Sequence, residues 1–246
     1  MTDEQKLAAK LAQGGHLKVG IIGAMDEEVE LLKASLNSRE DHCIAGYELY
    51  TGEMHGHQVV LLKSGIGKVN AAIGTTLMLQ LFEPDCVINT GSAGGFDPAL
   101  NVGDIVISSE VRHHDVDVTI FGYEAGQVPG QPAAFLPDQL LADTAERCIS
   151  RMQGMHTTRG MIATGDAFMN DPQRVARTRD TFPQMKAVEM EAAAIAQTCV
   201  QFNTPFLVIR ALSDIAGKES NISFEEFLPV AAKHSAEMIM AIIDEL

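Results

Sequence analysis

The sequence has 246 residues, is 46% hydrophobic and carries a formal net charge of -15 from 18 basic and 33 acidic residues. This length and apolar content favour one large α/β domain. The excess of acidic residues argues against nucleic acid or an anionic membrane surface as a partner. No apolar run approaches the ~18 residues of a membrane span.

The first sixteen residues are charged and contain no apolar signal core, so they do not indicate a secretory peptide. We expect residues 1–16 to form a mobile N-terminal extension ahead of a single domain at residues 17–246. The cysteines are far apart and show no CxxC or zinc spacing, which favours a reduced, cytoplasmic chain with structural thiols. They are Cys43, Cys86, Cys148 and Cys199.

The first predicted strand covers residues 17–22, and a helix follows from Met25 to about Leu36. Glu28 lies in the first turn of this helix. It could match the helix dipole there, or it could project into a cleft at the carboxyl end of the strand. The residue pattern leaves both interpretations open.

Residues 47–53 and 58–63 predict an antiparallel hairpin, and residues 69–82 predict a helix. Gly67-Lys68 faintly resembles a P-loop, but Leu62 replaces the first glycine and Val69 stands where Ser or Thr is needed. The pattern Gly20-x-x-Gly23 also lacks the full dinucleotide-binding glycine set. The sequence therefore predicts no ATP or dinucleotide site here.

The middle of the chain alternates buried strands with loops. Strands are predicted at residues 86–90 and 104–111, with a turn of small residues at Gly91–Gly95 that would let the backbone approach a ligand. His113-His114-Asp115 has no accompanying metal-ligand spacing, so we do not predict a metal site. Residues 118–132 predict a long loop, which is often functional in compact domains.

The second half predicts helices at residues 137–152 and 171–180 and a strand at residues 159–164. Val188–Glu191 should end another strand before a helix at residues 192–202. A buried strand at residues 206–209 is then followed by Arg210, Ser213 and Asp214. Ligands bind beyond the carboxyl ends of strands in open α/β sheets, so these residues should lie near a site. Ser223 should cap a final helix at residues 224–245.

These elements predict a single three-layer α/β domain with a twisted, mostly parallel or mixed central sheet and helices on both faces. Six segments in order also resemble the bacterial 5'-methylthioadenosine/S-adenosylhomocysteine nucleosidases. The resemblance runs from about Lys18 to the end of the chain. The segments are GIIGAMDEEVELL (20–32), LLKSGIGKVNAA (61–72), NTGSAGGFDPALNVGDIVIS (89–108), ATGDAFMN (163–170), AVEMEAAAIAQ (187–197) and VIRALSDIAG (208–217).

The resemblance implies a nucleoside-phosphorylase-like fold, a homodimer, and hydrolysis of the N-glycosidic bond to adenine and a thioribose, without a metal or organic cofactor. It implies that Glu28 activates water and that Asp214 protonates adenine at N7. The implied substrate contacts are Met190 and Glu191 on the ribose, Phe168 and Met169 on adenine, Ser92, Ala93 and Gly94 beside the sugar, and Phe121, Pro129 and Phe224 near the alkylthio group. Val118 and Pro129 would reach the neighbouring subunit's site. Met25, Ile66, Glu189, Arg210 and Ser213 complete the predicted site.

The chemistry fits three acidic residues, because cleaving a glycosidic bond needs an acid for the base, a base for water and negative charge near the sugar cation. Asp26, Glu27 and Glu28 together disfavour a phosphate dianion at the first strand. Arg210 could still bind phosphate, or it could pair with Glu189 or Glu191. A purine nucleoside phosphorylase, an aminodeoxyfutalosine hydrolase and a non-catalytic nucleoside-binding regulator therefore stay as alternatives.

Overall fold

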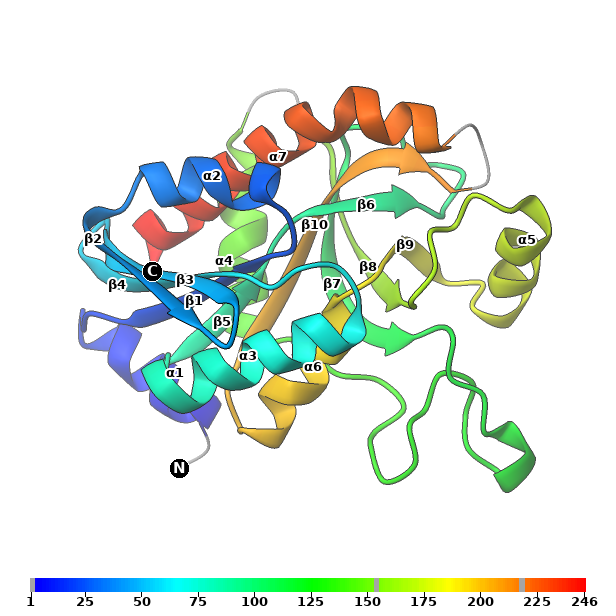
Figure 1. Cartoon of the computed structure of the whole chain (residues 1–246), viewed down its shortest axis with the longest axis horizontal. Helices are drawn as coiled ribbons and strands as arrows, with labels where there is room; N and C mark the ends of the chain where they lie inside the picture. Colours follow the sequence, from blue (N-terminus) through cyan, green and yellow to red (C-terminus); the bar gives the residue numbers. More distant parts are fainter. Residues whose placement is uncertain (1–2, 153–154, 217–219) are drawn as a thin grey trace.

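The protein, seen in a computed structural model that describes residues 3–152, 155–216 and 220–246, has a central sheet between layers of helices (Figure 1). The strands are β1 (Lys18–Gly23), β2 (Asn37–Ile44), β3 (Tyr47–Met54), β4 (His57–Lys63), β5 (Cys86–Asn89), β6 (Ser92–Gly95), β7 (Ile105–His113), β8 (Thr157–Thr164), β9 (Met185–Glu189) and β10 (Phe206–Ile215). The helices are α1 (Asp3–Ala12), α2 (Asp26–Ala34), α3 (Lys68–Phe82), α4 (Gln139–Ser150), α5 (Pro172–Thr181), α6 (Ala192–Gln201) and α7 (Ser220–Glu245), with a 3₁₀ turn at Thr119–Phe121.

The ten strands form one mixed sheet in the order β2-β3-β4-β1-β5-β10-β6-β9-β8-β7. The pairs β1–β4, β1–β5, β5–β10, β6–β10, β7–β8 and β8–β9 are parallel. Strand β10 also pairs with β7, in the antiparallel direction. The half of the sheet that contains β6 to β10 therefore curls and closes on itself.

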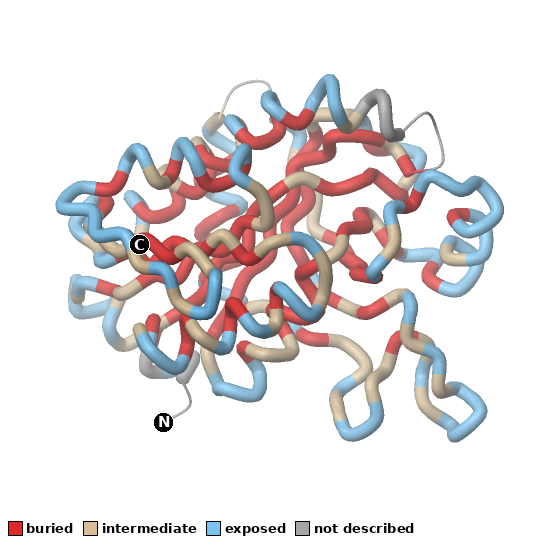
Figure 2. The backbone as a smooth tube through the Cα atoms, in the orientation of Figure 1, coloured by how far each residue is buried: buried red, intermediate tan, exposed pale blue. Residues whose placement is uncertain are grey.

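Strand β10 is buried along almost its whole length because helices cover both faces of the sheet. Leu207, Ile209 and Ala211 join one hydrophobic cluster. Val208 and Leu212 join a second cluster. Successive side chains of a strand point to opposite faces, so one continuous apolar run contributes to both halves of the core. Figure 2 shows the buried backbone concentrated along these central strands.

The two clusters show which helices cover which face. Residues of α2, α4 and α7, such as Leu32, Ile149 and Ile239, pack in the first cluster. Residues of α3 and α6, such as Met78 and Ile195, pack in the second. The predicted fold class, a three-layer α/β domain with a twisted mixed sheet, is confirmed.

Strand β2 was not predicted. Its sequence, NSREDHCI, has no apolar alternation, and all eight of its residues are exposed or partly exposed. It forms the edge of the sheet and pairs only with β3 among the described strands. An edge strand with one solvated side can consist of polar residues, so the usual strand pattern is missing.

Two predictions near the centre of the sheet were wrong. Residues 91–95 do not form a turn, because Ser92–Gly95 is strand β6, paired with β10 and β9. Small residues have low intrinsic strand propensity, and pairing on both sides overrides it. The last strand does not end at Ile209 but continues to Ile215, so Arg210, Ser213 and Asp214 lie within β10.

The two ends of the chain also differ from expectation. Residues 3–12 form helix α1, and Leu7 is buried in the first hydrophobic cluster with an exposed fraction of 2%. The predicted mobility of this segment stays a prediction, but the segment is not irregular. Helix α7 already begins at Ser220, so Ser223 is not its N-cap. The side chain of Ser223 lies outside the described residues.

Candidate active site

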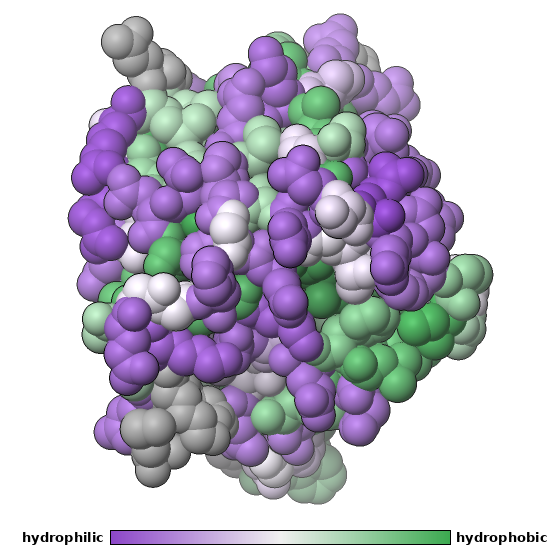
Figure 3. All heavy atoms as spheres, turned by 90° about the vertical axis from the view of Figure 1, so that its left-hand side faces the viewer, coloured by the Kyte–Doolittle hydropathy of each residue, from purple (hydrophilic) through white to green (hydrophobic). Residues whose placement is uncertain are grey.

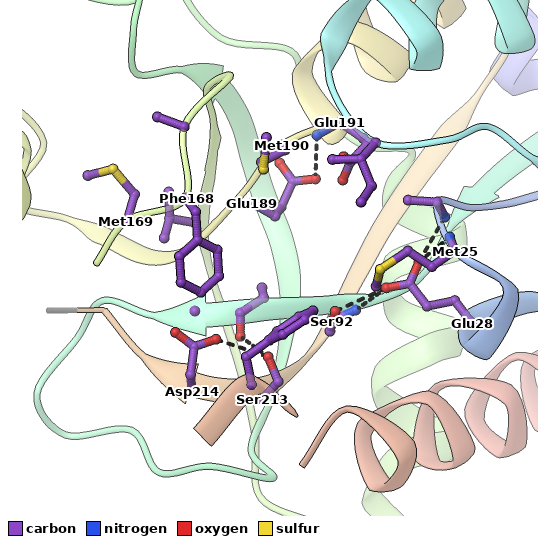
Figure 4. A pocket seen from close by; sticks show the side chains of 17 residues that line it. Met25, Glu28, Ser92, Phe168, Met169, Glu189, Met190, Glu191, Ser213 and Asp214 are labelled. Atoms are coloured by element: carbon purple, nitrogen blue, oxygen red, sulfur yellow. Dashed lines mark hydrogen bonds between the residues drawn. The ribbon is translucent and has the colours of Figure 1, made fainter. Parts of the chain in front are cut away.

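A cavity of about 210 Å³ lies at the edge of the sheet where β1, β8 and β9 end (Figure 4). The loops after these strands, the short strand β6, the end of β10 and the start of α7 form its walls. Its lining residues are Ala24, Met25, Glu28, Ile66, Ser92, Ala93, Gly94, Ala167, Phe168, Met169, Val188, Glu189, Met190, Glu191, Ser213, Asp214 and Phe224. This is the position at which open α/β sheets bind ligands.

Glu28 lies at one end of the cavity and is held by hydrogen bonds on both carboxylate oxygens. Oε2 accepts from the backbone amides of Ala24, at 2.7 Å, and Met25, at 3.3 Å. Oε1 accepts from the amide of Ser92, at 2.9 Å, and from its hydroxyl, at 3.0 Å. Glu28 therefore does both things that the sequence left open, since it caps α2 and also borders the cavity.

Glycine at position 91 makes room for this carboxylate. Gly91 has a φ of 150°, and a Cβ atom there would lie 2.7 Å from Glu28 Oε1 and 3.1 Å from Arg210 Nη1. Such contacts are too short for carbon. The glycine therefore serves close approach of side chains to the backbone, within a segment that the sequence predicted to be a turn.

Asp214 lies towards the other end of the cavity, beside Phe168 (Figure 4). The pairing of β10 with β6 shifts register between Leu212 and Asp214. Such an irregularity re-aims side chains, and here both Ser213 and Asp214 line the cavity although they are consecutive in a strand. Burial raises the pKa of Asp214 to about 6, against the opposing effect of the Ser213 hydroxyl, which donates to Oδ1 over 3.0 Å.

Glu189 lines the cavity and is the anion of a buried ion pair, with Arg210 behind it. Its Oε2 accepts from Arg210 Nη2 at 2.6 Å and from the backbone amides of Glu191 and Ala192 at 2.9 and 2.8 Å. The Thr164 hydroxyl donates to its other oxygen. Arg210 is 2% exposed and its Nη2 also donates to Asn89 Oδ1 at 2.7 Å. A pair with this many hydrogen bonds is costly to break, because one buried charge would be left alone.

Glu191, the N-cap residue of α6, is the carboxyl group with the most perturbed environment in the cavity. Burial, the nearby negative charge of Glu189 and, to a smaller extent, that of Glu28 raise its pKa, while Arg210 and the amide of Gly67 act against the shift. The Gly67 amide donates to Glu191 Oε1 at 2.8 Å. Carboxyl groups whose pKa values are raised by burial within one cavity are typical of catalytic sites.

The remaining wall is apolar. Phe168 is 39% exposed and packs edge-on against Phe224, with 5.8 Å between ring centroids. Met169 and Ile66 also line this region. An exposed aromatic ring at a cavity mouth offers a flat surface on which a planar ligand can stack.

Nearly all predicted site residues come together, but Arg210 does not line the cavity. It lies behind Glu189, so of the two roles that the sequence left open the structure shows the ion pair. Val118, Phe121 and Pro129 are also outside the cavity of this single chain, and their contribution to a neighbouring subunit stays a prediction. Ala24, Ala167 and Val188 line the cavity and were not predicted individually, although each adjoins a predicted residue.

No group of three or more His, Cys, Asp or Glu side chains that could hold a metal ion occurs in the described parts of the chain. His113 is buried, lies 3.1 Å from Gln197 Oε1 through Nε2, and packs on Phe135. No helix in those parts is long and apolar enough to cross a membrane.

Residues 18–244 match the profile of the Phosphorylase superfamily. A 5'-methylthioadenosine/S-adenosylhomocysteine nucleosidase from Lysinibacillus sphaericus is 64% identical over 230 residues, which are 94% of this chain and 100% of that relative. The chain belongs to the 5'-methylthioadenosine/S-adenosylhomocysteine nucleosidase family. The resemblance read from six sequence segments is therefore confirmed.

Solved structures of this nucleosidase family share the fold. The enzyme from Colwellia psychrerythraea, solved in complex with adenine, superposes with a TM-score of 0.92 at 52% identity and covers 94% of this chain and 96% of its own. The enzyme from Neisseria meningitidis, solved in complex with methylthio-immucillin-A, gives a TM-score of 0.91 at 49% identity, with 93% and 99% covered.

Proposed function

We propose that this chain hydrolyses the N-glycosidic bond of 5'-methylthioadenosine and S-adenosylhomocysteine, and also of 5'-deoxyadenosine, to adenine and the corresponding sugar. Such a reaction would serve methionine salvage and the recycling of S-adenosylmethionine by-products. The observation that carries the proposal is the placement of two carboxyl groups, Glu28 and Asp214, towards opposite ends of one cavity in a member of this nucleosidase family.

In the proposed mechanism Glu28 accepts a proton from water, and the water oxygen bonds to C1' of the ribose. The bond from C1' to N9 breaks, and Asp214 gives its proton to N7 of the departing adenine. The raised pKa of Asp214 supports this role, because a general acid needs its proton near the working pH. Each of these two proton transfers would typically raise the reaction rate 100- to 10,000-fold.

Glu191 would bind the ribose hydroxyls with Met190 beside it, and Phe168 would stack on adenine next to Met169. The negative charge of Glu28 and Glu189 would favour the positive charge that develops on the sugar ring. The apolar end at Phe224 would take the alkylthio group, joined by Phe121 and Pro129 of a neighbouring subunit.

Water is favoured over phosphate as the nucleophile. Phosphate would need free cationic or N–H donors on the attack side. In the structure, the amides of Ala24, Met25 and Ser92 already donate to Glu28, and Arg210 is engaged by Glu189 and Asn89. This occupancy supports the hydrolase over a purine nucleoside phosphorylase.

We further propose a homodimer in the cytoplasm. Side chains of Ile66, Val69, Leu136, Ile120 and Phe121 are between 51% and 88% exposed, and exposed apolar patches mark interaction sites. Figure 3 shows one mostly hydrophilic face with apolar side chains gathered towards one edge. The free thiols at Cys43, Cys86, Cys148 and Cys199 fit a reducing compartment.

The test is adenine release from 5'-methylthioadenosine, first in phosphate-free buffer and then with added phosphate. We expect fast release without phosphate and free methylthioribose as the second product. Release only with phosphate, as a sugar 1-phosphate, would identify a phosphorylase. No release in either buffer, combined with turnover of aminodeoxyfutalosine, would move the assignment to that nucleoside. Binding without turnover of either would indicate a regulator.

A further inference from the structure

Two walls of the cavity are joined outside it by three charged residues, Lys68, Asp115 and Asp166, which we call the rim clamp. Lys68 Nζ lies 2.7 Å from Asp115 Oδ1 and 4.0 Å from Asp166 Oδ2. The backbone amide of Asp166 donates to Asp115 Oδ2 at 2.9 Å. Partial burial raises the pKa of Asp115, but both hydrogen bonds and the charge of Lys68 together outweigh it, so the pKa lies below its usual value.

The clamp also satisfies the start of helix α3, which has no side-chain cap of its own. The backbone amide of Lys68 donates to Asp166 Oδ1 at 2.8 Å. The preceding amide, that of Gly67, donates to Glu191 Oε1 at 2.8 Å. Two consecutive amides at a helix N-terminus therefore hold two carboxylates, one outside the cavity and one inside it.

The Asp166 carboxylate lies close to the backbone of Gly67. Gly67 has a φ of 95°, and a Cβ atom on it would lie 3.2 Å from Asp166 Oδ1. Because Asp166 also accepts from the next amide, that of Lys68, it holds the backbone from which the Gly67 amide points. That amide in turn accounts for one of the hydrogen bonds that orient Glu191.

Asp166 also belongs to the loop that carries Ala167 and Phe168 in the cavity wall. This loop follows β8, whereas Gly67 follows β4 and Glu191 follows β9. Figure 4 shows Phe168 and Glu191 on different sides of the cavity. Their relative position depends on contacts between loops that are far apart in sequence, and the rim clamp supplies such contacts.

We propose that Asp166, held by Lys68 and Asp115, is a positioning residue that couples the aromatic wall for the base to the carboxyl group for the sugar. The inference rests on the proposed nucleosidase function and assigns roles to three residues outside the cavity. Phe168 and Glu191 would then be brought into register together, as a reaction that is sensitive to geometry of about 1 Å requires.

The test compares Asp166→Ala with a matched control, Asp143→Ala. Asp143 on α4 is also about half exposed, and its Oδ1 lies 2.6 Å from Nη2 of Arg159 on β8. Neither residue lines the cavity. We expect Asp166→Ala to lower kcat/KM roughly tenfold and to weaken binding of adenine alone as well as of methylthio-immucillin-A. Asp143→Ala should match the wild type, and Asp166→Asn should restore most activity, because its Oδ1 can still accept from Lys68.

A second comparison separates coupling from a general loss of stability. In a Glu191→Gln background, Asp166→Ala should still weaken adenine binding, but its further effect on kcat/KM should shrink because the two residues act on one contact. The inference would be overturned if the losses in kcat/KM from Asp166→Ala and Glu191→Gln added in full. It would also be overturned if Asp166→Ala had the same activity and adenine binding as Asp143→Ala. If the wild type released no adenine, the proposed function would be refuted instead. Adenine binding by Asp166→Ala and Asp143→Ala would then still test the role of the rim clamp.

Discussion

Asp214 combines two properties that normally oppose each other, a buried position and an acidic side chain. Its pKa of about 6 in the folded chain lies above the 3.8 of an unperturbed aspartate. The folded state therefore binds this proton more tightly than the unfolded state does. Above pH 6 the ionised group destabilises the fold by on the order of 3 kcal/mol. In the proposed mechanism, this is the cost of keeping a proton available to the leaving group.

We expect Asp214→Asn to lose nearly all turnover while gaining stability at alkaline pH. The gain should be largest above pH 6, should decrease between pH 6 and about 4 as the wild-type group becomes protonated, and should be absent below that range. Urea unfolding of both proteins at pH 8, 6 and 4 measures it. Equal stability at pH 8 would show that Asp214 is not destabilised by burial, and normal turnover would remove it as the acid.

The surroundings of Glu28 differ from those of Asp214, because both carboxylate oxygens of Glu28 accept hydrogen bonds from fixed N–H groups. In Glu28→Gln the side-chain NH₂ would face either the Ala24 and Met25 amides or the Ser92 amide, and a buried donor pair would be left unsatisfied at about 1–3 kcal/mol. We expect lost hydrolysis, retained binding of methylthio-immucillin-A and a lower unfolding midpoint. Activity assays, calorimetric binding and thermal unfolding test this. A variant that hydrolyses normally would place water activation elsewhere.

Gly91 is the residue whose lack of a side chain matters most for Glu28. In Gly91→Ala the new methyl group would meet Glu28 Oε1, and the carboxylate would have to move. This displacement of the Glu28 carboxylate should lower kcat by about a hundredfold. Gly46→Ala is the control, since Gly46 also has a positive φ, of 85°, but meets nothing within 4 Å. An equal effect in both variants would point to backbone strain and not to Glu28.

At the scale of the elements, helix α1 is a helix that the sequence analysis did not predict. Leu7 is 2% exposed within the first hydrophobic cluster, and Lys10 Nζ lies 2.5 Å from Asp85 Oδ1. If α1 is docked in solution, Leu7→Ala should cost about 2–5 kcal/mol. Denaturant unfolding, with the exposed Ala8→Ser as control, measures this. Unchanged stability would show that residues 1–16 are mobile, as the sequence predicted.

At the scale of the whole molecule, the loop at residues 118–132 projects from the body of the protein (Figure 1). Phe121 in this loop is 77% exposed. In the proposed dimer it would be covered by the partner, so Phe121→Asp should weaken assembly and raise KM for the methylthio substrate. Light scattering and kinetics over a dilution series test both effects. The control is Leu31→Asp on α2, a helix that packs on the opposite face of the sheet from α3. A monomer with full activity would refute the proposal that the two subunits share a site.

Much of the fold could be predicted from local patterns. The hairpin of β3 and β4, the apolar helix α3 and the amphipathic helix α4 were predicted from their own residues, and each was confirmed. The polar edge strand β2 and the glycine-rich β6 could not be predicted, because their pairing partners and not their own residues make them strands. The closure of β10 onto β7 is likewise a contact between distant segments.

The sequence by itself determined the fold class, the family and nearly all of the residues around the cavity. The reason is that six of its segments, several of them at the ends of predictable strands, resemble those of the family. Only the tertiary structure decided how each of them is held there. It placed Arg210 behind Glu189, raised the pKa of Asp214 through burial, and joined Asp166 to Glu191 through the start of α3. Burial, charge coupling and contact between loops depend on distances in space, and no local sequence pattern contains those distances.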